Sequence, residues 1–152
     1  MPAEIGKPAP DFKLQDQTNN PVSLEDLKGS KAIIVFIPFP NTGVCDGELC
    51  ALRDDYANLQ SLGAKVVAIS TTPRPSLKAW SDQNNFPFPL LADFWPHGAV
   101  SKEYGAFNEA NGAAWRYSYI LDAEGVVRSM VRSEQLPQAR EQEAYAKALA
   151  EI

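Results

Sequence analysis

The chain has 152 residues, the usual length of one domain, and we expect residues 1–152 to fold as a single unit. Hydrophobic residues make up 45% of the chain and charged residues 22%, which is typical of globular proteins and excludes a disordered or fibrous one. The formal net charge is −5, and the sequence contains no cluster of Lys and Arg, so we expect no nucleic-acid partner.

The sequence gives no sign of membrane insertion or export. Its longest apolar run, from Ala32 to Pro40, is far shorter than the roughly 20 residues of a membrane-spanning helix. No basic and then apolar stretch follows Met1, so we expect no signal peptide. These features predict a cytoplasmic protein without a membrane partner.

The chain has two cysteines, Cys45 and Cys50, and a single histidine, His97. They are too few for a tetrahedral zinc site, and the sequence offers no site for haem or flavin, so we expect no metal and no cofactor. Two cysteines in a chain of this kind are more often free or catalytic than joined in a structural bridge.

Hydrophobic periodicity predicts strands and helices along the whole chain. Runs of β-branched residues are typical of buried strands, and apolar residues three and four apart are typical of amphipathic helices. In chain order we predict an N-terminal β-hairpin over 11–21, a helical turn between a Ser23–Asp26 capping box and Gly29, a strand over 31–38, a helix over 46–62, a strand over 65–70, a helix opened by Pro73 and Pro75 and running to Asn84, an extended piece over 88–91, a helix over 96–104, a β-hairpin over 117–131 and a C-terminal helix over 138–152.

The order of these elements predicts the fold. A strand, a helix and a second strand between residues 31 and 70 form a βαβ unit, whose two strands should be parallel with a right-handed crossover. An antiparallel hairpin and a helix then close the chain. We therefore predict an α/β protein with a thioredoxin-like fold, in which helices cover both faces of a mixed central sheet and a β-hairpin lies at the N-terminus.

Cys45 follows a buried strand at the point where a helix starts. A helix N-terminus carries partial positive charge and free N–H groups, which favour the thiolate, the nucleophilic form of cysteine. The Thr42 hydroxyl is placed to bond the thiolate or a bound substrate, and Pro38 is placed to shield one side of the sulfur. The alternative is that Cys45 is a small apolar residue of the core.

The pattern Pro38-x-x-x-Thr42-x-x-Cys45 resembles the active-site signature of the peroxiredoxins. Further segments resemble the alkyl hydroperoxide reductase E subfamily and are spread over nearly the whole chain, at 7–12, 47–49, 52–54, 93–98 and 114–116. The resemblance implies a thiol-dependent peroxidase that reduces hydrogen peroxide, organic hydroperoxides or peroxynitrite. It also implies an external reductant, which would be a thioredoxin-like or glutaredoxin-like protein or a small thiol, and a homodimer.

The same resemblance assigns roles to single residues. Cys45 would be the peroxidatic cysteine, Thr42 would orient the peroxide, and Pro38 would shield the sulfur. Arg116 would stabilise the thiolate and the departing oxygen, and Glu48 would pair with Arg116. The chemistry of Arg116 agrees, because a guanidinium is permanently charged and carries its donors in a rigid fork. The alternatives are a surface arginine and an exposed glutamate that the helix dipole favours.

Cys50 resembles the resolving cysteine of the peroxiredoxin Q or bacterioferritin-comigratory group, which many alkyl hydroperoxide reductase E relatives lack. In an intact helix the Cα atoms of Cys45 and Cys50 would be about 8–9 Å apart. A disulfide needs about 4.4–6.8 Å, so the bridge requires the first turn to unwind. Gly43 and Gly47 weaken that turn. The alternative is that Cys50 is a packed helix residue beside Leu49.

Two other functions remain open at this stage. A thioredoxin-like disulfide oxidoreductase fits the predicted fold, although that chemistry normally uses Cys-x-x-Cys. A thiol redox sensor without catalytic activity also fits, and it differs in reacting once where an enzyme turns over with a reductant.

Overall fold

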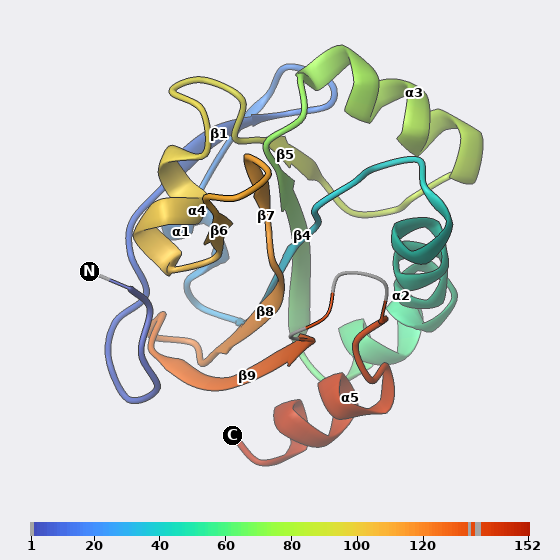
Figure 1. Cartoon of the computed structure of the whole chain (residues 1–152). Helices are drawn as coiled ribbons and strands as arrows, with labels where there is room; N and C mark the ends of the chain where they lie inside the picture. Colours follow the sequence, from blue (N-terminus) through green and yellow to red (C-terminus); the bar gives the residue numbers. More distant parts are fainter. Residues whose placement is uncertain (1, 134, 136–137) are drawn as a thin grey trace.

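The computed structural model describes residues 2–133, 135 and 138–152 (Figure 1). Its strands are β1 (Lys13–Asp16), β2 (Pro21–Ser23), β3 (Lys31–Phe36), β4 (Ala64–Ser70), β5 (Leu90–Ala92), β6 (Phe107–Asn108), β7 (Ala113–Ala114), β8 (Arg116–Leu121) and β9 (Val127–Ser133). Its helices are α1 (Leu24–Leu27), α2 (Gly43–Ser61), α3 (Arg74–Asn84), α4 (Ala99–Tyr104) and α5 (Glu143–Ala150). None of these helices is long and apolar enough to cross a membrane.

A mixed sheet of seven strands runs through the molecule in the order β2-β1-β5-β4-β3-β8-β9. Strands β3, β4 and β5 are parallel neighbours, while β8 is antiparallel to both β3 and β9. Strands β1 and β2 form the predicted N-terminal hairpin. The predicted βαβ unit and closing hairpin are therefore confirmed, because β3, α2 and β4 follow one another with their strands in parallel.

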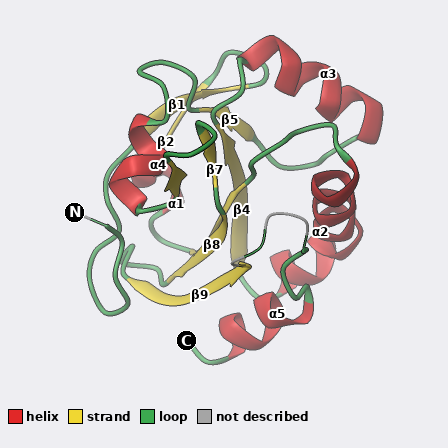
Figure 2. Ribbon diagram, viewed as in Figure 1, coloured by secondary structure: helices red, strands yellow, loops and turns green. Residues whose placement is uncertain are grey.

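Helices cover both faces of the sheet, as predicted (Figure 2). Successive residues of β3 enter opposite cores: Ile33 and Val35 pack into one apolar cluster, and Ile34 packs into the other. The first cluster is covered by α2, α3 and α5, and the second by α1 and α4. This alternation explains why β3 reads as a continuous apolar run, since neither face meets water.

The start of α2 differs from the prediction in a way that matters for Cys45. The helix begins at Gly43, before the predicted start at Asp46, because Thr42 adopts the extended conformation of an N-cap residue, with φ −127° and ψ 158°. Cys45 therefore lies inside the first turn of the helix.

Two other helices begin later than predicted, and one short ribbon is an additional element. Helix α4 begins at Ala99, after the predicted residue 96, because Gly98 has φ +69° and the Asp93 carboxylate accepts the N–H groups of Val100 and Ser101. Helix α5 begins at Glu143, after the predicted residue 138. The ribbon of β6 and β7 was not predicted, because strands of two residues are too short to show alternation.

Candidate active site

Cys45 is fully buried in the first turn of α2, at 0% exposure, at the end of the sheet where β3 stops. The loop after β3 leads directly into this turn, whose first bond runs from the Asp46 N–H to the Thr42 carbonyl at 2.7 Å. The N-terminus of α2, with its partial positive charge, therefore lies close to Cys45.

Arg116 reaches Cys45 from the neighbouring strand. Strand β8 is antiparallel to β3, with Val35 opposite Ser118, so Arg116 starts β8 at the edge where β3 ends. Its Nη1 donates to Cys45 Sγ at 2.9 Å and to Glu48 Oε1 at 2.7 Å. Arg116 is 2% exposed, so the alternative of a surface arginine is wrong. Glu48 is also buried, because it lies one turn along the inner side of α2.

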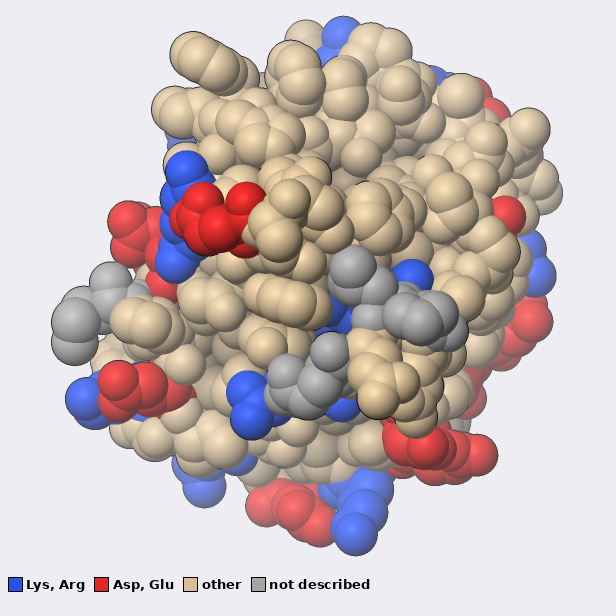
Figure 3. All heavy atoms as spheres, in the orientation of Figure 1, with Lys and Arg blue, Asp and Glu red and all other residues tan. Residues whose placement is uncertain are grey.

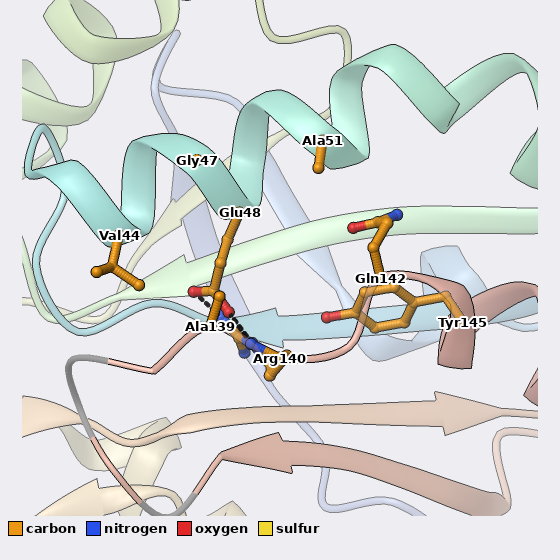
Figure 4. Close-up of a pocket in the computed structure, with 8 residues that line it drawn as sticks. All are labelled: Val44, Gly47, Glu48, Ala51, Ala139, Arg140, Gln142 and Tyr145. Atoms are coloured by element: carbon orange, nitrogen blue, oxygen red, sulfur yellow. Dashed lines mark hydrogen bonds and ion pairs between the residues drawn. The ribbon is translucent and has the colours of Figure 1, made fainter.

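A second arginine, Arg140, completes the site and was missed at the sequence level (Figure 4). Its backbone N–H and Nε both donate to Glu48 Oε2 at 2.8 Å, and its Nη2 donates to Glu48 Oε1 at 2.9 Å. Its Nη1 donates to the Phe36 carbonyl at 2.8 Å and to Ser118 Oγ at 3.1 Å. These bonds hold residue 140 outside α5, which is why the helix starts later than predicted.

The charged side chains behind Cys45 do not cancel. Counted over the described residues, two buried guanidinium groups, of Arg116 and Arg140, surround one buried carboxylate, of Glu48. Burial raises the pKa of Glu48, but the hydrogen bonds and charge of Arg140, together with the charge of Arg116, outweigh it and hold the pKa below its ordinary value. One positive charge is thus left over beside the Cys45 sulfur.

Comparison with known proteins identifies the family of a chain with this fold and site. Residues 5–130 match the AhpC/TSA family. The chain belongs to the AhpC/TSA family. It is 42% identical over 149 residues to alkyl hydroperoxide reductase E of Mycobacterium tuberculosis, with 97% of each chain covered. It is 36% identical over 134 residues to the chloroplastic peroxiredoxin Q of Sedum lineare, covering 88% of this chain and 71% of that one.

A solved structure agrees with these relatives. Enterococcus faecalis AhpC superposes with a TM-score of 0.88 at 30% identity, covering 98% of this chain and 92% of the other. The resemblance to the peroxiredoxins and the thioredoxin-like fold are therefore confirmed, and the protein is a thiol-dependent peroxidase.

Two residues of the peroxiredoxin signature lie in the loop before α2. Pro38 is buried, whereas Thr42 is exposed. Thr42 Oγ1 donates to the Phe39 carbonyl at 2.6 Å and not to the sulfur. We expected the Thr42 hydroxyl to bond either the thiolate or a bound substrate. In this structure its hydrogen is bonded to the backbone of the loop, so it makes no bond to the sulfur.

The second cysteine of this peroxiredoxin lies further along α2 than the first. Cys45 and Cys50 are both free thiols, and Cys50 is half-buried on the side of α2 that faces α3. Its Sγ lies 3.7 Å from Asn84 Oδ1. Cys50 also packs against the apolar cluster of that face of the sheet. With α2 intact, Cys45 is fully buried beside Arg116, whereas Cys50 is half-buried beside Asn84.

Proposed function

We propose that this peroxiredoxin reduces hydrogen peroxide and organic hydroperoxides through Cys45. The observation that carries the proposal is the buried contact of Arg116 Nη1 with Cys45 Sγ at 2.9 Å, which puts a fixed cation beside the nucleophile. The name of the relative in M. tuberculosis, alkyl hydroperoxide reductase E, supports a hydroperoxide substrate.

The reaction is a displacement at oxygen. The Cys45 thiolate attacks the terminal peroxide oxygen, an S–O bond forms, and the O–O bond breaks. The products are Cys45 sulfenic acid and a hydroxide or alkoxide, which takes a proton and leaves as water or an alcohol. Arg116 stabilises the negative charge as it moves from sulfur to the departing oxygen, and Glu48 and Arg140 fix the position of Arg116.

The loop before α2 orients the peroxide. Because the Thr42 hydrogen is already bonded to the Phe39 carbonyl, the lone pairs of Oγ1 are available to accept a hydrogen bond from the peroxide O–H. Pro38 is a buried residue of this loop, and it has no backbone N–H that could donate a hydrogen bond to the sulfur. We assign Thr42 to orienting the substrate and Pro38 to shielding the thiolate from water.

Cys50 resolves the sulfenic acid in this proposal. Its thiol condenses with Cys45 sulfenic acid, so that one S–S bond and one water molecule form. Helix geometry forbids this bond in an intact α2, and the first turn must unwind. Gly43 and Gly47 both lie in or next to that turn and lower its helical stability. An external dithiol protein or small thiol then reduces the disulfide.

The proposed resolution is tested by counting free thiols and measuring intact mass after one equivalent of hydrogen peroxide. We expect both thiols to disappear from a species of monomer mass, about 2 Da lighter. Cys50→Ser should instead stop at a sulfenic acid that dimedone traps. A trappable sulfenic acid in the wild type would assign Cys50 a structural role. Reaction without turnover when dithiothreitol is added would indicate a sensor and overturn the peroxidase.

We propose a homodimer formed through an apolar surface near the site. Phe39, Phe94 and Trp95 are 38%, 47% and 82% exposed. They follow the carboxyl ends of β3 and β5, so they lie at the same edge of the sheet as Cys45. Exposed aromatic side chains gathered in this way are typical of protein interfaces. In sedimentation, we expect twice the chain mass of 16.7 kDa, and Trp95→Glu should lower it.

A matched control for the interface is Ile5→Glu. Ile5 is 62% exposed, and its neighbour Gly6 bonds Val127, at the opposite edge of the sheet. This variant should therefore remain dimeric. A monomeric wild type, or equal effects of Trp95→Glu and Ile5→Glu, would contradict the proposed interface.

The surface and the thiols fit the remaining expectations. On the face shown in Figure 3, the described Lys and Arg side chains are interspersed with Asp and Glu and form no broad basic surface. Together with the formal net charge of −5, this supports the proposal that the protein has no nucleic-acid partner. Two free thiols fit a reducing compartment, and we propose that the protein works in the cytoplasm.

A further inference from the structure

Helix α3 holds the first turn of α2 through paired contacts. Asp46 and Cys50 are four residues apart and lie on the same side of α2, and Trp80 and Asn84 are four residues apart on α3. Trp80 Nε1 donates to the Asp46 carboxylate, and Asn84 Oδ1 lies 3.7 Å from Cys50 Sγ. The residue that follows Cys45 is thus tied to the neighbouring helix.

We propose that the hydrogen bond between Trp80 and Asp46 is a latch that keeps the first turn of α2 helical and sets the rate at which Cys45 reaches Cys50. The inference rests on the proposed resolving role of Cys50. It assigns Asp46 and Trp80 as positioning residues, because their hydrogen bond acts on the backbone of α2 and not on the reacting atoms.

The burial of Trp80 gives the latch its strength. Trp80 is 2% exposed, and its ring packs edge-on against Phe86, with 5.1 Å between the centroids. Unwinding the first turn moves Asp46 away and leaves the indole N–H without an acceptor in the core. The indole N–H is a donor only, and Asp46 is its acceptor among the described residues. Leaving such a donor unpaired is unfavourable.

Other restraints on this turn are weak or disappear on oxidation. Gly43 and Gly47 disfavour a helix, and within the described residues the Thr42 side chain makes no capping bond to α2. The bond from Arg116 to Cys45 is strong while the sulfur is an anion. Cys45 sulfenic acid is neutral, so this tie weakens after the peroxide reacts. The latch then remains as the side-chain hydrogen bond that holds the first turn itself, while Glu48 in the next turn stays bonded to Arg116 and Arg140.

The latch therefore divides the sulfenic acid between two reactions. In the first, Cys45 sulfenic acid and the Cys50 thiol give a disulfide and water. In the second, a further hydroperoxide molecule oxidises the sulfenic acid to a sulfinic acid and is itself reduced to an alcohol or water. A tighter latch slows the first reaction and so favours the second at high peroxide.

The test compares variants that separate the hydrogen bond from charge and from packing. Trp80→Phe removes the N–H donor and keeps Asp46, whereas Asp46→Asn removes the charge and keeps an oxygen that accepts the bond. Phe86→Leu disturbs the packing of the Trp80 ring and leaves the bond in place. Asp46→Ala is a second way to remove the bond if Trp80→Phe does not fold. Disulfide formation is timed by quenched-flow alkylation and intact mass after one equivalent of hydrogen peroxide.

We expect Trp80→Phe and Asp46→Ala to accelerate disulfide formation roughly tenfold to a hundredfold, the change that loss of a hydrogen bond to a charged group makes in an equilibrium constant. They should also need more peroxide to reach the sulfinic acid. Asp46→Asn keeps a neutral hydrogen bond, which is about half as strong as one to a charged group, so its rate should lie between those of the wild type and Asp46→Ala. Phe86→Leu keeps the charged bond and should stay within about threefold of the wild type.

The outcomes separate the latch from the role of Cys50. A wild type that forms the disulfide while Trp80→Phe and Asp46→Ala form it at the same rate overturns the latch and keeps Cys50 as the resolving residue. Equal acceleration in Phe86→Leu assigns the effect to packing and also overturns it. A disulfide that appears only in Trp80→Phe and Asp46→Ala supports the latch. If none of the variants forms a disulfide, both proposals fail.

Discussion

Replacing Glu48 with glutamine tests the arrangement of charges behind Cys45. The carboxylate accepts bonds from Arg116 Nη1 and from the N–H, Nε and Nη2 of Arg140. A glutamine offers one oxygen and turns its own NH₂ group toward a guanidinium, so donors face donors. Removing one partner of a buried ion pair costs about 3–5 kcal/mol. Total stability is about 5–15 kcal/mol, so we expect a folded protein whose Tm falls by roughly 6–20 °C.

The same substitution should slow the chemistry. Glu48 fixes the guanidinium that contacts Cys45 Sγ, and small displacements of a catalytic group cost up to about a hundredfold in rate. We expect the second-order rate constant for hydrogen peroxide to fall roughly tenfold to a hundredfold, measured by stopped-flow competition at 25 °C. Asp54→Asn is the matched control on α2, because its ion pair with Arg53 is at the surface and is screened by solvent.

Two results would refute this reasoning. If Glu48→Gln lowers Tm no more than Asp54→Asn does, the bonds between Glu48 and the two arginines contribute little to stability. If its Tm falls while the rate constant stays within twofold of the wild type, Glu48 supports the fold but does not position Arg116 for the reaction.

Three further predictions concern the same site and the core beside it. Arg116→Lys keeps the charge but replaces the planar guanidinium whose Nη1 bonds both Cys45 and Glu48, and we expect its peroxide rate constant to fall roughly a hundredfold. A loss below threefold would contradict this. The fold lowers the pKa of Glu48, so the contribution of its carboxylate to stability is present above the unfolded pKa and is lost as pH falls through the folded pKa. The free energy of unfolding, measured with urea, should therefore fall less steeply with decreasing pH in Glu48→Gln than in the wild type. The same pH dependence at acid pH in both proteins would argue against the lowered pKa. Leu49→Ala, at a position with 0% exposure, should reduce the free energy of unfolding by about 2–5 kcal/mol, whereas a loss below about 1 kcal/mol would show that its core cluster repacks.

The parts of the site that are local in sequence could be predicted. Pro38, Thr42 and Cys45 belong to one loop and one helical turn, so their proximity follows from the chain itself. Arg116 could be proposed through the family resemblance and the start of a strand. Its burial could not be predicted, because it depends on β8 pairing with β3 in one particular register.

The parts of the site that depend on distant contacts could not be predicted. Arg140 lies 92 residues from Glu48, and no spacing or motif distinguishes it from other basic residues near the C-terminus. The burial of Glu48 could not be predicted either, because the first turn of a helix favours acidic residues whether or not they are exposed. The bond between Asp46 and Trp80 likewise requires α2 and α3 to be packed together.

The account depends most directly on Cys45 being the group that reduces the peroxide. The measurement that tests this is the rate of hydrogen peroxide consumption by the reduced wild type and by Cys45→Ser at equal concentration. We expect the wild type to consume peroxide far faster than free cysteine does and Cys45→Ser to show no reaction above the buffer. Consumption by Cys45→Ser at the wild-type rate would contradict the account.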